Sequence, residues 1–289
     1  MRKYFKGWYY KIQNEQISAA FIPSLSKGKT GNAVASIQVI TSFGSWNIEY
    51  PDNEFIQHKN GSIPSVTVGR SFFSTRGMSI SINSNGVNIS GRLTFCNRRA
   101  LGGDIMGPFR YVPFMECRHH VLSMYHEVSG ELTINGRQFI FVNAPGYIEG
   151  DEGRSFPREY AWTHFMKGGT TPVSIMLSVA DIPISSYHFI GVIGFVLYGD
   201  KEYRIATYRG AKAVLIDDGR LTVWQNDLCL TAELIERSPA MLNAPSSGSM
   251  IRKIHEDISC RAGYSLRINN DVIYSGISDR ASFEYEFKS

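Results

Sequence analysis

The chain has 289 residues, 43% of them apolar and 19% charged, which is enough apolar material for the cores of two ordinary domains. The formal net charge of +4 is small, and lysine and arginine form no long run, which argues against a nucleic-acid-binding protein. No stretch reaches the roughly 20 apolar residues of a transmembrane helix, although peripheral contact with a membrane surface stays open.

The four cysteines are widely separated in the sequence and form no CxxC pair, unlike most zinc sites and disulfide frameworks. They are Cys96, Cys117, Cys229 and Cys260. The N-terminal segment Met1–Lys11 carries positive charge but lacks the apolar core and the small-residue cleavage site of a secretory signal. These features predict reduced thiols and a cytoplasmic protein.

Alternation of apolar and polar residues, which is typical of β-strands, runs along much of the chain. Residues 86–95 and 131–142 alternate in this way, and Asn135-Gly136 lies at the centre of the second segment. Asn-Gly between two alternating runs is a strong hairpin signal, because both turn residues must adopt positive φ. Similar signals recur at Gly199-Asp200 and Asn269-Asn270, whereas sustained helical periodicity is hard to find. We therefore predict an all-β fold of antiparallel strands with few short helices.

The arrangement of these strands is only partly indicated by the pattern. The 15 Tyr and 17 Phe favour a barrel that holds a ligand among aromatic side chains, although the alternation by itself also fits a sandwich. Pro145-Gly146 follows a hairpin and predicts a boundary between two domains, residues 1–144 and 145–289. A second segment rich in Pro, Gly and Ser, residues 238–249, is predicted to form a long loop.

The densest group of charged residues lies in the segment 146–160, GYIEGDEGRSFPREY. If this segment is extended, Tyr147, Glu149 and Asp151 share one face, because side chains alternate along a strand. Two neighbouring carboxyl groups disfavour each other's ionisation, which can keep one of them as a neutral general acid. The alternative is a charged, solvated loop in which Arg154 and its neighbours pair with carboxylates.

The segment 107–127 contains three histidines and a cysteine, the residue types of a metal site. Strand geometry argues against such a site, since His120 and His126 share a face but lie about 20 Å apart at about 3.3 Å per residue. Glu116, Arg118 and His120 also share a face. They form either a hydrogen-bonded group that supports the sheet or the polar wall of a cavity.

The chain resembles the tocopherol cyclase-like family in five blocks that span nearly its whole length. The blocks are KGWYYK at 6–11, GPFRYVPFMECRHHVLSMYH at 107–126, NAPGYIEGDEGRSFPREYAWTHF at 143–165, GSMIRKIHEDISC at 248–260 and RASFEYEF at 280–287. The core of the third block is the most specific. One position departs from the family pattern, because Glu152 stands where family members usually carry Trp.

This resemblance implies two lipocalin-like antiparallel barrels packed together, and an intramolecular lyase (an isomerase) that closes a chromanol ring on a prenylated quinol. An alkene is a weak base, so a neutral acid must be held against it while the phenol oxygen attacks the forming cation. We expect Glu149 or Asp151 to be the acid, Glu116 or His120 to accept the phenolic proton, and no cofactor or metal to take part. The residues expected to contact the apolar ligand are Trp8, Tyr10, Tyr147, Trp162, Arg118 and Arg154.

Two other functions fit the same sequence features. The first is a lipid- or isoprenoid-binding barrel without chemistry, because a fold does not establish catalysis. The second is an isoprenoid hydratase, in which water rather than a phenol attacks the cation. All three functions require an apolar cavity, which we expect to be several hundred Å³ in volume and to be bordered by residues 116–126 and 146–160.

Overall fold

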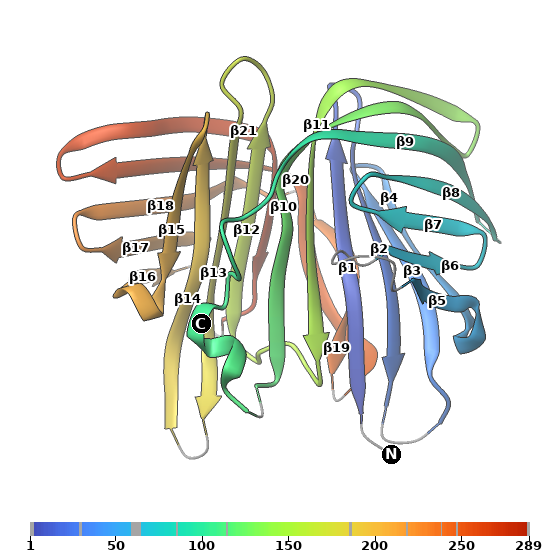
Figure 1. Cartoon of the computed structure of the whole chain (residues 1–289), viewed down its shortest axis with the longest axis horizontal. Coiled ribbons are helices and arrows are strands. Elements are labelled where there is room, and N and C mark those ends of the chain that lie inside the picture. Colours follow the sequence, from blue (N-terminus) through green and yellow to red (C-terminus); the bar gives the residue numbers. More distant parts are fainter. Residues whose placement is uncertain are drawn as a thin grey trace.

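The computed structural model of the chain describes residues 3–28, 31–58, 65–84, 86–113, 115–184, 187–217, 219–237, 239–246 and 248–287 (Figure 1). Almost all of them belong to antiparallel strands. Helical structure within these ranges is limited to the 3₁₀ segments η1 (Asp52–Glu54), η2 (Gly107–Tyr111) and η3 (Thr207–Arg209). No helix in the described part is long and apolar enough to cross a membrane. The prediction of an all-β fold with few short helices is confirmed.

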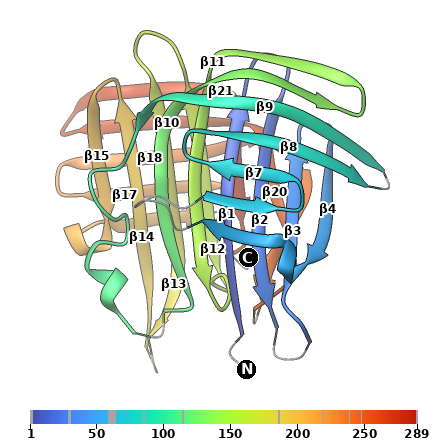
Figure 2. The ribbon, with the colours of Figure 1, turned by 45° about the vertical axis from the view of Figure 1, so that its right-hand side comes forward.

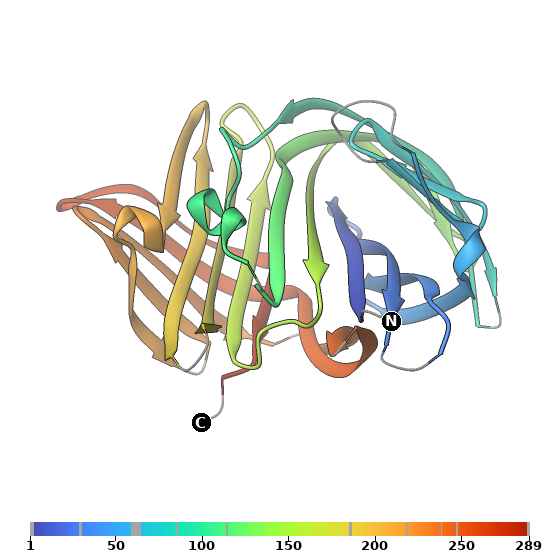
Figure 3. The same ribbon diagram turned by 60° about the horizontal axis from the view of Figure 1, so that its bottom comes forward.

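The first sheet curls into a nearly closed barrel (Figure 3). Its strands are β1 (Tyr4–Gln13), β2 (Ser18–Lys27), β3 (Val34–Thr41), β4 (Gly44–Pro51), β5 (Phe55–His58), β6 (Ser65–Val68), β7 (Ser71–Ser74), β8 (Gly77–Ser84), β9 (Val87–Arg99), β10 (Cys117–Ile134) and β11 (Arg137–Gly153). They pair in the order β4-β3-β2-β1-β11-β10-β9-β8-β7-β6-β5. One residue in two along these strands, such as Tyr10, Phe73 and Phe139, points into a large apolar cluster that fills the interior.

The second sheet forms a half-barrel beside the first (Figure 2). Its strands are β12 (Tyr160–Lys167), β13 (Val173–Ile184), β14 (Tyr187–Tyr198), β15 (Lys201–Ala206), β16 (Lys212–Asp217), β17 (Arg220–Gln225), β18 (Leu228–Glu236), β19 (Pro239–Ser246), β20 (Ser249–Ile268) and β21 (Asp271–Tyr285). They pair in the order β15-β14-β13-β12-β21-β20-β18-β17-β16, and β19 pairs with β20 off this path. Its own apolar cluster includes Phe165, Leu230 and Phe283.

The turn signals of the sequence lie at hairpins. Asn135 and Gly136 connect β10 to β11 with φ values of 48° and 80°, which is the positive-φ pair that a two-residue hairpin requires. Gly199 and Asn269 also adopt positive φ between paired strands. The loop predicted for residues 238–249 is wrong for the described part of that range, because residues 239–246 form β19. Prolines are compatible with this strand because it lies at a margin of the sheet, where a missing N–H costs little.

The change from the first sheet to the second occurs between Gly153 and Tyr160. Strand β11 does not end at Pro145-Gly146, since Pro145 pairs with Glu127 of β10 and the ladder continues to Gly153. The division of the chain into domains at residues 1–144 and 145–289 stays a prediction.

The two sheets pack through the faces that point away from their own interiors. On β1, Tyr10 points into the first barrel, whereas Tyr9 and Lys11 face the second sheet. The buried Lys11 ammonium donates to Ser282 Oγ at 2.8 Å and to the Arg280 carbonyl at 3.1 Å. A third apolar cluster, with members from both sheets, lies in this interface. The interface therefore combines apolar packing with hydrogen bonds to buried polar groups such as Lys11.

The connection between β9 and β10 leaves the first sheet and lies against the second (Figure 1, green coil beside β14). Arg204 of β15 donates to the Asp104 carbonyl at 2.8 Å, and the Phe109 ring stacks on Phe189 at 5.9 Å. This long connection covers one side of the space between the sheets with Met106 and Phe109.

Two histidines are buried as neutral groups in this framework. Burial and then Arg98 lower the pKa of His126 to about 3, and burial together with Lys11 lowers the pKa of His164 well below its usual value of 6.5. The Nδ1 atom of His126 lies 3.0 Å from Ser123 Oγ. Gly146 gives this ring its space, because a side chain there would collide with the ring.

We predict that acid destabilises the protein from pH 6.5 downward. Below that pH the unfolded state binds a proton on His126 that the folded state does not, until pH approaches the folded pKa of about 3. His126 alone should therefore lower the free energy of unfolding by up to about 1.4 kcal/mol per pH unit as pH falls. Urea unfolding between pH 7 and pH 4.5 measures this slope.

The substitution His126→Leu should reduce the slope, whereas His188→Leu, at an exposed histidine on β14, should not reduce it. Equal slopes for the parent protein and His126→Leu would contradict the prediction.

Candidate functional site

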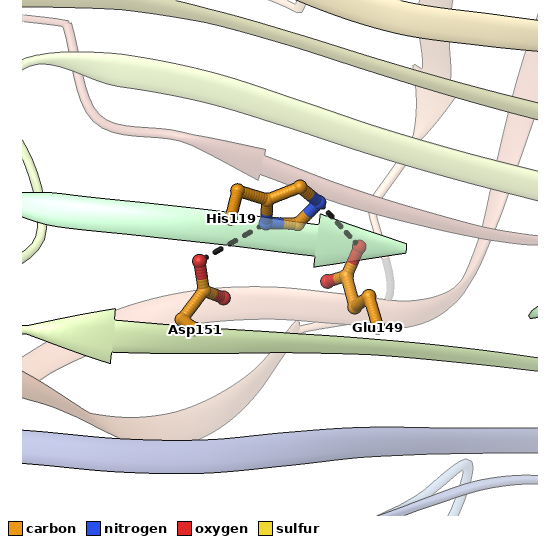
Figure 4. A group of neighbouring side chains, drawn as sticks. All are labelled: His119, Glu149 and Asp151. Carbon is orange, nitrogen blue, oxygen red and sulfur yellow. Dashed lines mark hydrogen bonds and ion pairs between the residues drawn. The ribbon is translucent and has the colours of Figure 1, made fainter. Parts of the chain in front are cut away.

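The pairing of β10 with β11 brings a histidine and two carboxyl groups together. In this ladder His119 lies opposite Asp151, and Val121 lies opposite Glu149. Residues opposite each other in an antiparallel pair share a face, so the three side chains His119, Glu149 and Asp151 converge on one side of the sheet. Figure 4 shows the His119 ring between the two carboxyl groups. Nδ1 lies 3.0 Å from Asp151 Oδ1, and Nε2 lies 3.2 Å from Glu149 Oε2.

This cluster holds a proton on His119. Burial opposes the charged imidazole, but the charges of Asp151 and Glu149 outweigh burial and raise the pKa of His119 well above its usual value of 6.5. The Nδ1 contact is a hydrogen bond, whereas the Nε2 contact is an ion pair without hydrogen-bond alignment among the described residues. The imidazolium is therefore held more firmly by Asp151 than by Glu149.

Tyr147 supports Glu149 from the same face of β11. Its hydroxyl donates to Glu149 Oε2 at 2.6 Å, and its ring stacks on His164 of β12 with centroids 3.8 Å apart. Burial and the neighbouring Glu149 raise the pKa of Tyr147 well above 10.0, so the hydroxyl keeps its proton and acts as a donor. Both contacts of Glu149 with His119 and Tyr147 use Oε2, which leaves Oε1 as the oxygen available to a ligand.

Cys117 completes the polar group on β10. Its thiol donates to Asp151 Oδ1 at 3.4 Å. Burial, followed by the charge of Asp151, raises the pKa of Cys117 well above its usual value of 9.0. A neutral thiol is a poor nucleophile, so Cys117 serves here as a hydrogen-bond donor.

The cluster borders a cavity of about 180 Å³ between the two sheets. The apolar part of the wall includes Phe5, Tyr9, Phe109, Phe156, Trp162 and Ile193. The cavity is bordered by the two segments expected from the sequence, since Glu116 and Phe156 also line it, but it is smaller than expected. It lies between the barrels because apolar side chains fill their interiors.

Several residues singled out from the sequence lie at this cavity. Glu149, Asp151 and Glu116 line it, as does Trp162. Tyr147 is fully buried behind Glu149. The extended conformation of residues 146–153 and the shared face of Tyr147, Glu149 and Asp151 agree with the strand interpretation rather than with a solvated loop.

Other candidates lie elsewhere. His120 is on the opposite face of β10 from His119, with Nε2 3.7 Å from Glu152 Oε1. Arg118 and Arg154 are exposed. Tyr10 is buried inside the first barrel, with its ring 5.4 Å from that of Phe73.

Trp8 has a mixed position. It stacks on Phe55 within the first barrel, with the ring centroids 6.2 Å apart, and it also borders the cavity. The acidic residues expected from the sequence thus lie at the cavity, but the histidine that joins them is His119 and not the expected His120.

Two residues of the site were missed, His119 and Glu284. Strand alternation places His119 and His120 on opposite faces, but nothing in the local pattern indicates which of these faces meets Glu149. Glu284 of β21 also borders the cavity and accepts a hydrogen bond from Tyr160 at 2.6 Å. It lies in the last block of the resemblance, RASFEYEF, which was the only sequence signal for it.

Among the described residues, His119, Glu149 and Asp151 could hold a metal ion, because one ligand atom of each lies within 4.8 Å of the others. A metal ion requires a deprotonated imidazole, whereas the two carboxylates favour a proton on His119. The expectation that no metal takes part stays a prediction.

The comparisons with known proteins show similarity of fold. The sequence matches no protein-family model and no curated protein. Two crystal structures of CghA, one of them with Sch210972, align with TM-scores of 0.64 and 0.63 at 11% identity, over 98% of this chain and 88% of theirs. Kievitone hydratase from Nectria haematococca aligns with a TM-score of 0.51 at 11% identity, over 98% of this chain and 89% of the other.

A protein assigned as an AttH from Nitrosomonas europaea has a TM-score of 0.53 at 8% identity, over 100% of this chain and 93% of its own. At such low identities the alignments establish a shared lipocalin-like two-barrel fold, while activity depends on the residues of the site.

We predict that His119 makes the protein less stable as pH rises above 6.5. Its folded-state pKa is raised, so its contribution is complete below the unfolded value of 6.5 and is lost as pH rises through the folded value. Between these values the free energy of unfolding should fall by up to about 1.4 kcal/mol per pH unit. Urea unfolding at pH 6 to 9 tests this, and His119→Gln should lack the decline.

The matched control is His120→Gln, which changes the neighbouring histidine on the opposite face and should keep the decline. A parent protein whose stability is flat over this range would refute the charged state assigned to His119.

Proposed function

We propose that this protein binds a long apolar ligand of the prenylated quinol class and cyclises it, as a tocopherol cyclase-like isomerase. The observation that carries the proposal is the His119–Glu149–Asp151 cluster in the wall of a cavity lined mainly by aromatic and aliphatic side chains. A proton-holding group in an apolar cavity is the requirement for protonating an alkene without water.

Glu149 is the group we assign to proton delivery. With His119 protonated and both carboxyl groups ionised, the cluster carries one net negative charge. One further proton, placed on Glu149, makes the cluster neutral. That proton passes from Glu149 Oε1 to an alkene carbon, and the phenol oxygen attacks the tertiary cation that forms. The phenolic proton then leaves to a base, so the product is an isomer of the substrate and no oxidant, reductant or cofactor is consumed.

The cavity wall suits the cationic intermediate. Tyr9 and Trp162 present aromatic rings that contact each other edge to face at 5.6 Å, and both line the cavity. Aromatic faces stabilise a positive charge by about 1–2 kcal/mol each when water is excluded. Once Glu149 has released its proton, the negative charge of the cluster lies beside the forming cation and stabilises it further.

The fold neighbours are compatible with this function. One CghA structure contains Sch210972, and another neighbour is named a hydratase. The fold thus occurs with a small-molecule ligand and in an enzyme, and these two facts support a ligand-binding cavity here. The four cysteines are free thiols, which supports the cytoplasmic location we propose.

A hydratase is the second candidate, favoured by the similarity to kievitone hydratase. It would use the same proton donor, with water as the nucleophile. Its product is heavier than the substrate by one water, whereas the product of cyclisation has the same mass. A barrel that binds an isoprenoid without chemistry is the third candidate.

We predict that Glu149→Gln abolishes turnover while ligand binding persists. The change keeps the shape of the side chain but removes the proton, and loss of a general acid costs about 100-fold to 10,000-fold in rate. Geranylhydroquinone is incubated with the protein in D₂O, the products are separated, and their molecular masses are measured by mass spectrometry. The expected product is a chromanol that carries one deuterium on carbon.

Glu152→Gln is the control, since Glu152 lies on the same strand but on the opposite face from Glu149, with Lys6 and His120. It should keep the parental rate. Binding without turnover by the parent protein would favour the non-catalytic barrel, and a product heavier by one water would favour the hydratase. A Glu149→Gln variant as fast as the parent would show that the proton comes from another group.

A further inference from the structure

The cavity has a second polar group on the wall opposite the His119–Glu149–Asp151 cluster. Glu284 of β21 is buried and accepts a hydrogen bond of 2.6 Å from the Tyr160 hydroxyl. Both residues line the cavity. This pair matches the Tyr147–Glu149 pair of the first sheet in chemistry and in length. The two sheets therefore each present one tyrosine-supported glutamate.

The strand pairings place these two glutamates on either side of one aromatic contact. Tyr9 of β1 is the cross-strand partner of Glu149, and Trp162 of β12 is the cross-strand partner of Glu284. The Tyr9 and Trp162 rings meet edge to face with centroids 5.6 Å apart. A ligand that lies on this aromatic pair has one glutamate at each side.

Trp162 provides a hydrogen-bond donor that the protein leaves unused. Its indole Nε1 is buried and has no hydrogen-bond partner among the described residues, although the side chain lines the cavity. A buried donor without a partner is unfavourable, because it has given up its hydrogen bond to water. Buried indole N–H groups usually have a partner, so a donor without one beside a cavity is a candidate to bind an acceptor atom of a ligand.

We propose that Trp162 and Glu284 bind the oxygen nucleophile of the ligand, opposite the proton donor Glu149. The indole N–H donates to the oxygen, and the hydroxyl of the ligand donates to the Glu284 carboxylate. This inference rests on the proposed cyclisation and assigns the groups that orient the attacking atom. It requires a ligand with a hydroxyl group close to its alkene, such as the phenol of a prenylated quinol, rather than a plain hydrocarbon.

With Glu149 as proton donor and Glu284 as proton acceptor, every proton that moves in the reaction is accounted for. Glu149 gives a proton to the alkene carbon, the oxygen forms its bond to the cation, and the oxygen loses its proton to Glu284. One carboxyl group has then lost a proton and the other has gained one, and exchange with solvent after product release restores both. Tyr160 keeps its proton, because burial and the charge of Glu284 raise its pKa well above 10.0, and it orients Glu284 throughout.

The test compares the binding of geranylhydroquinone with that of geranylbenzene, which has the same chain and ring but no hydroxyl. Isothermal titration gives the affinity ratio for the parent, Trp162→Phe and Glu284→Gln. The parent should prefer the hydroquinone, and each substitution should reduce that preference about tenfold, the equivalent of one hydrogen bond. Affinity for geranylbenzene should stay within about twofold of the parent, since the apolar contacts remain.

Matched controls are Trp224→Phe and Glu233→Gln, because both side chains are well exposed on the second sheet. Neither should change the preference. Circular dichroism and urea unfolding verify that each variant is folded. If Glu284→Gln does not fold, Trp162→Phe alone decides, because it keeps an aromatic ring in the interface.

Turnover separates this inference from the proposed function. With an active parent, Glu284→Gln should lower kcat and Trp162→Phe should mainly raise KM. If the parent protein binds the hydroquinone selectively but does not turn it over, the proposed cyclisation is rejected, and the assignment of Trp162 and Glu284 as the oxygen-binding site is kept. A parent that does not discriminate between the two compounds, or variants that keep its preference, would overturn the oxygen site whatever the turnover.

Discussion

The antiparallel pairing of β10 with β11 is the constraint on which the site depends. It places His119 opposite Asp151 and within reach of Glu149, and these three residues line the cavity between the sheets. Taking a charged imidazole out of water is unfavourable, and two carboxylates on the adjacent strand reverse this preference. The pairing thus stabilises a buried charge, the imidazolium of His119, in the wall of the cavity.

The same fold buries histidine in two opposite states. His119 is held as a cation by its two carboxylates, whereas His126 and His164 are kept neutral by burial and by nearby cations. The difference arises from neighbours rather than from depth, since all three side chains are nearly or fully buried. His164 also stacks on Tyr147, so a neutral imidazole lies directly behind the tyrosine that supports Glu149.

The position of the cavity follows from how the two barrels are filled. Apolar side chains occupy both interiors, so space for a ligand remains where the outer faces of the sheets meet. These faces carry polar residues that each sheet alone would expose, including Lys11, Glu149 and Glu284. When the sheets pack, these residues are buried, and each is paired with another polar group. Residues that would lie on the surface of a single sheet thus become the polar part of the lining of an apolar cavity. A single barrel would have left them in solvent.

The sequence by itself determined the class of fold and the faces of its strands. Alternation predicted antiparallel strands, Asn135-Gly136 predicted the hairpin, and the period of two placed Tyr147, Glu149 and Asp151 together. These features are local, because turn conformation and side-chain alternation depend on residues close in the chain.

The tertiary structure alone decided which histidine joins the acids. His120 lies fourteen residues before Ile134, and Asp151 lies fourteen residues after Arg137, the residue that pairs with Ile134. A ladder without irregularities would therefore have paired His120 with Asp151. Irregularities between Val121 and Gly130 shift the register by one residue in total, and His119 takes the place opposite Asp151. A shift of one residue exchanges the two faces of a strand, and such bulges respond to packing across the whole sheet. Glu284 joined the site for the same kind of reason, since only the packing of β21 against the first sheet brings it to the cavity.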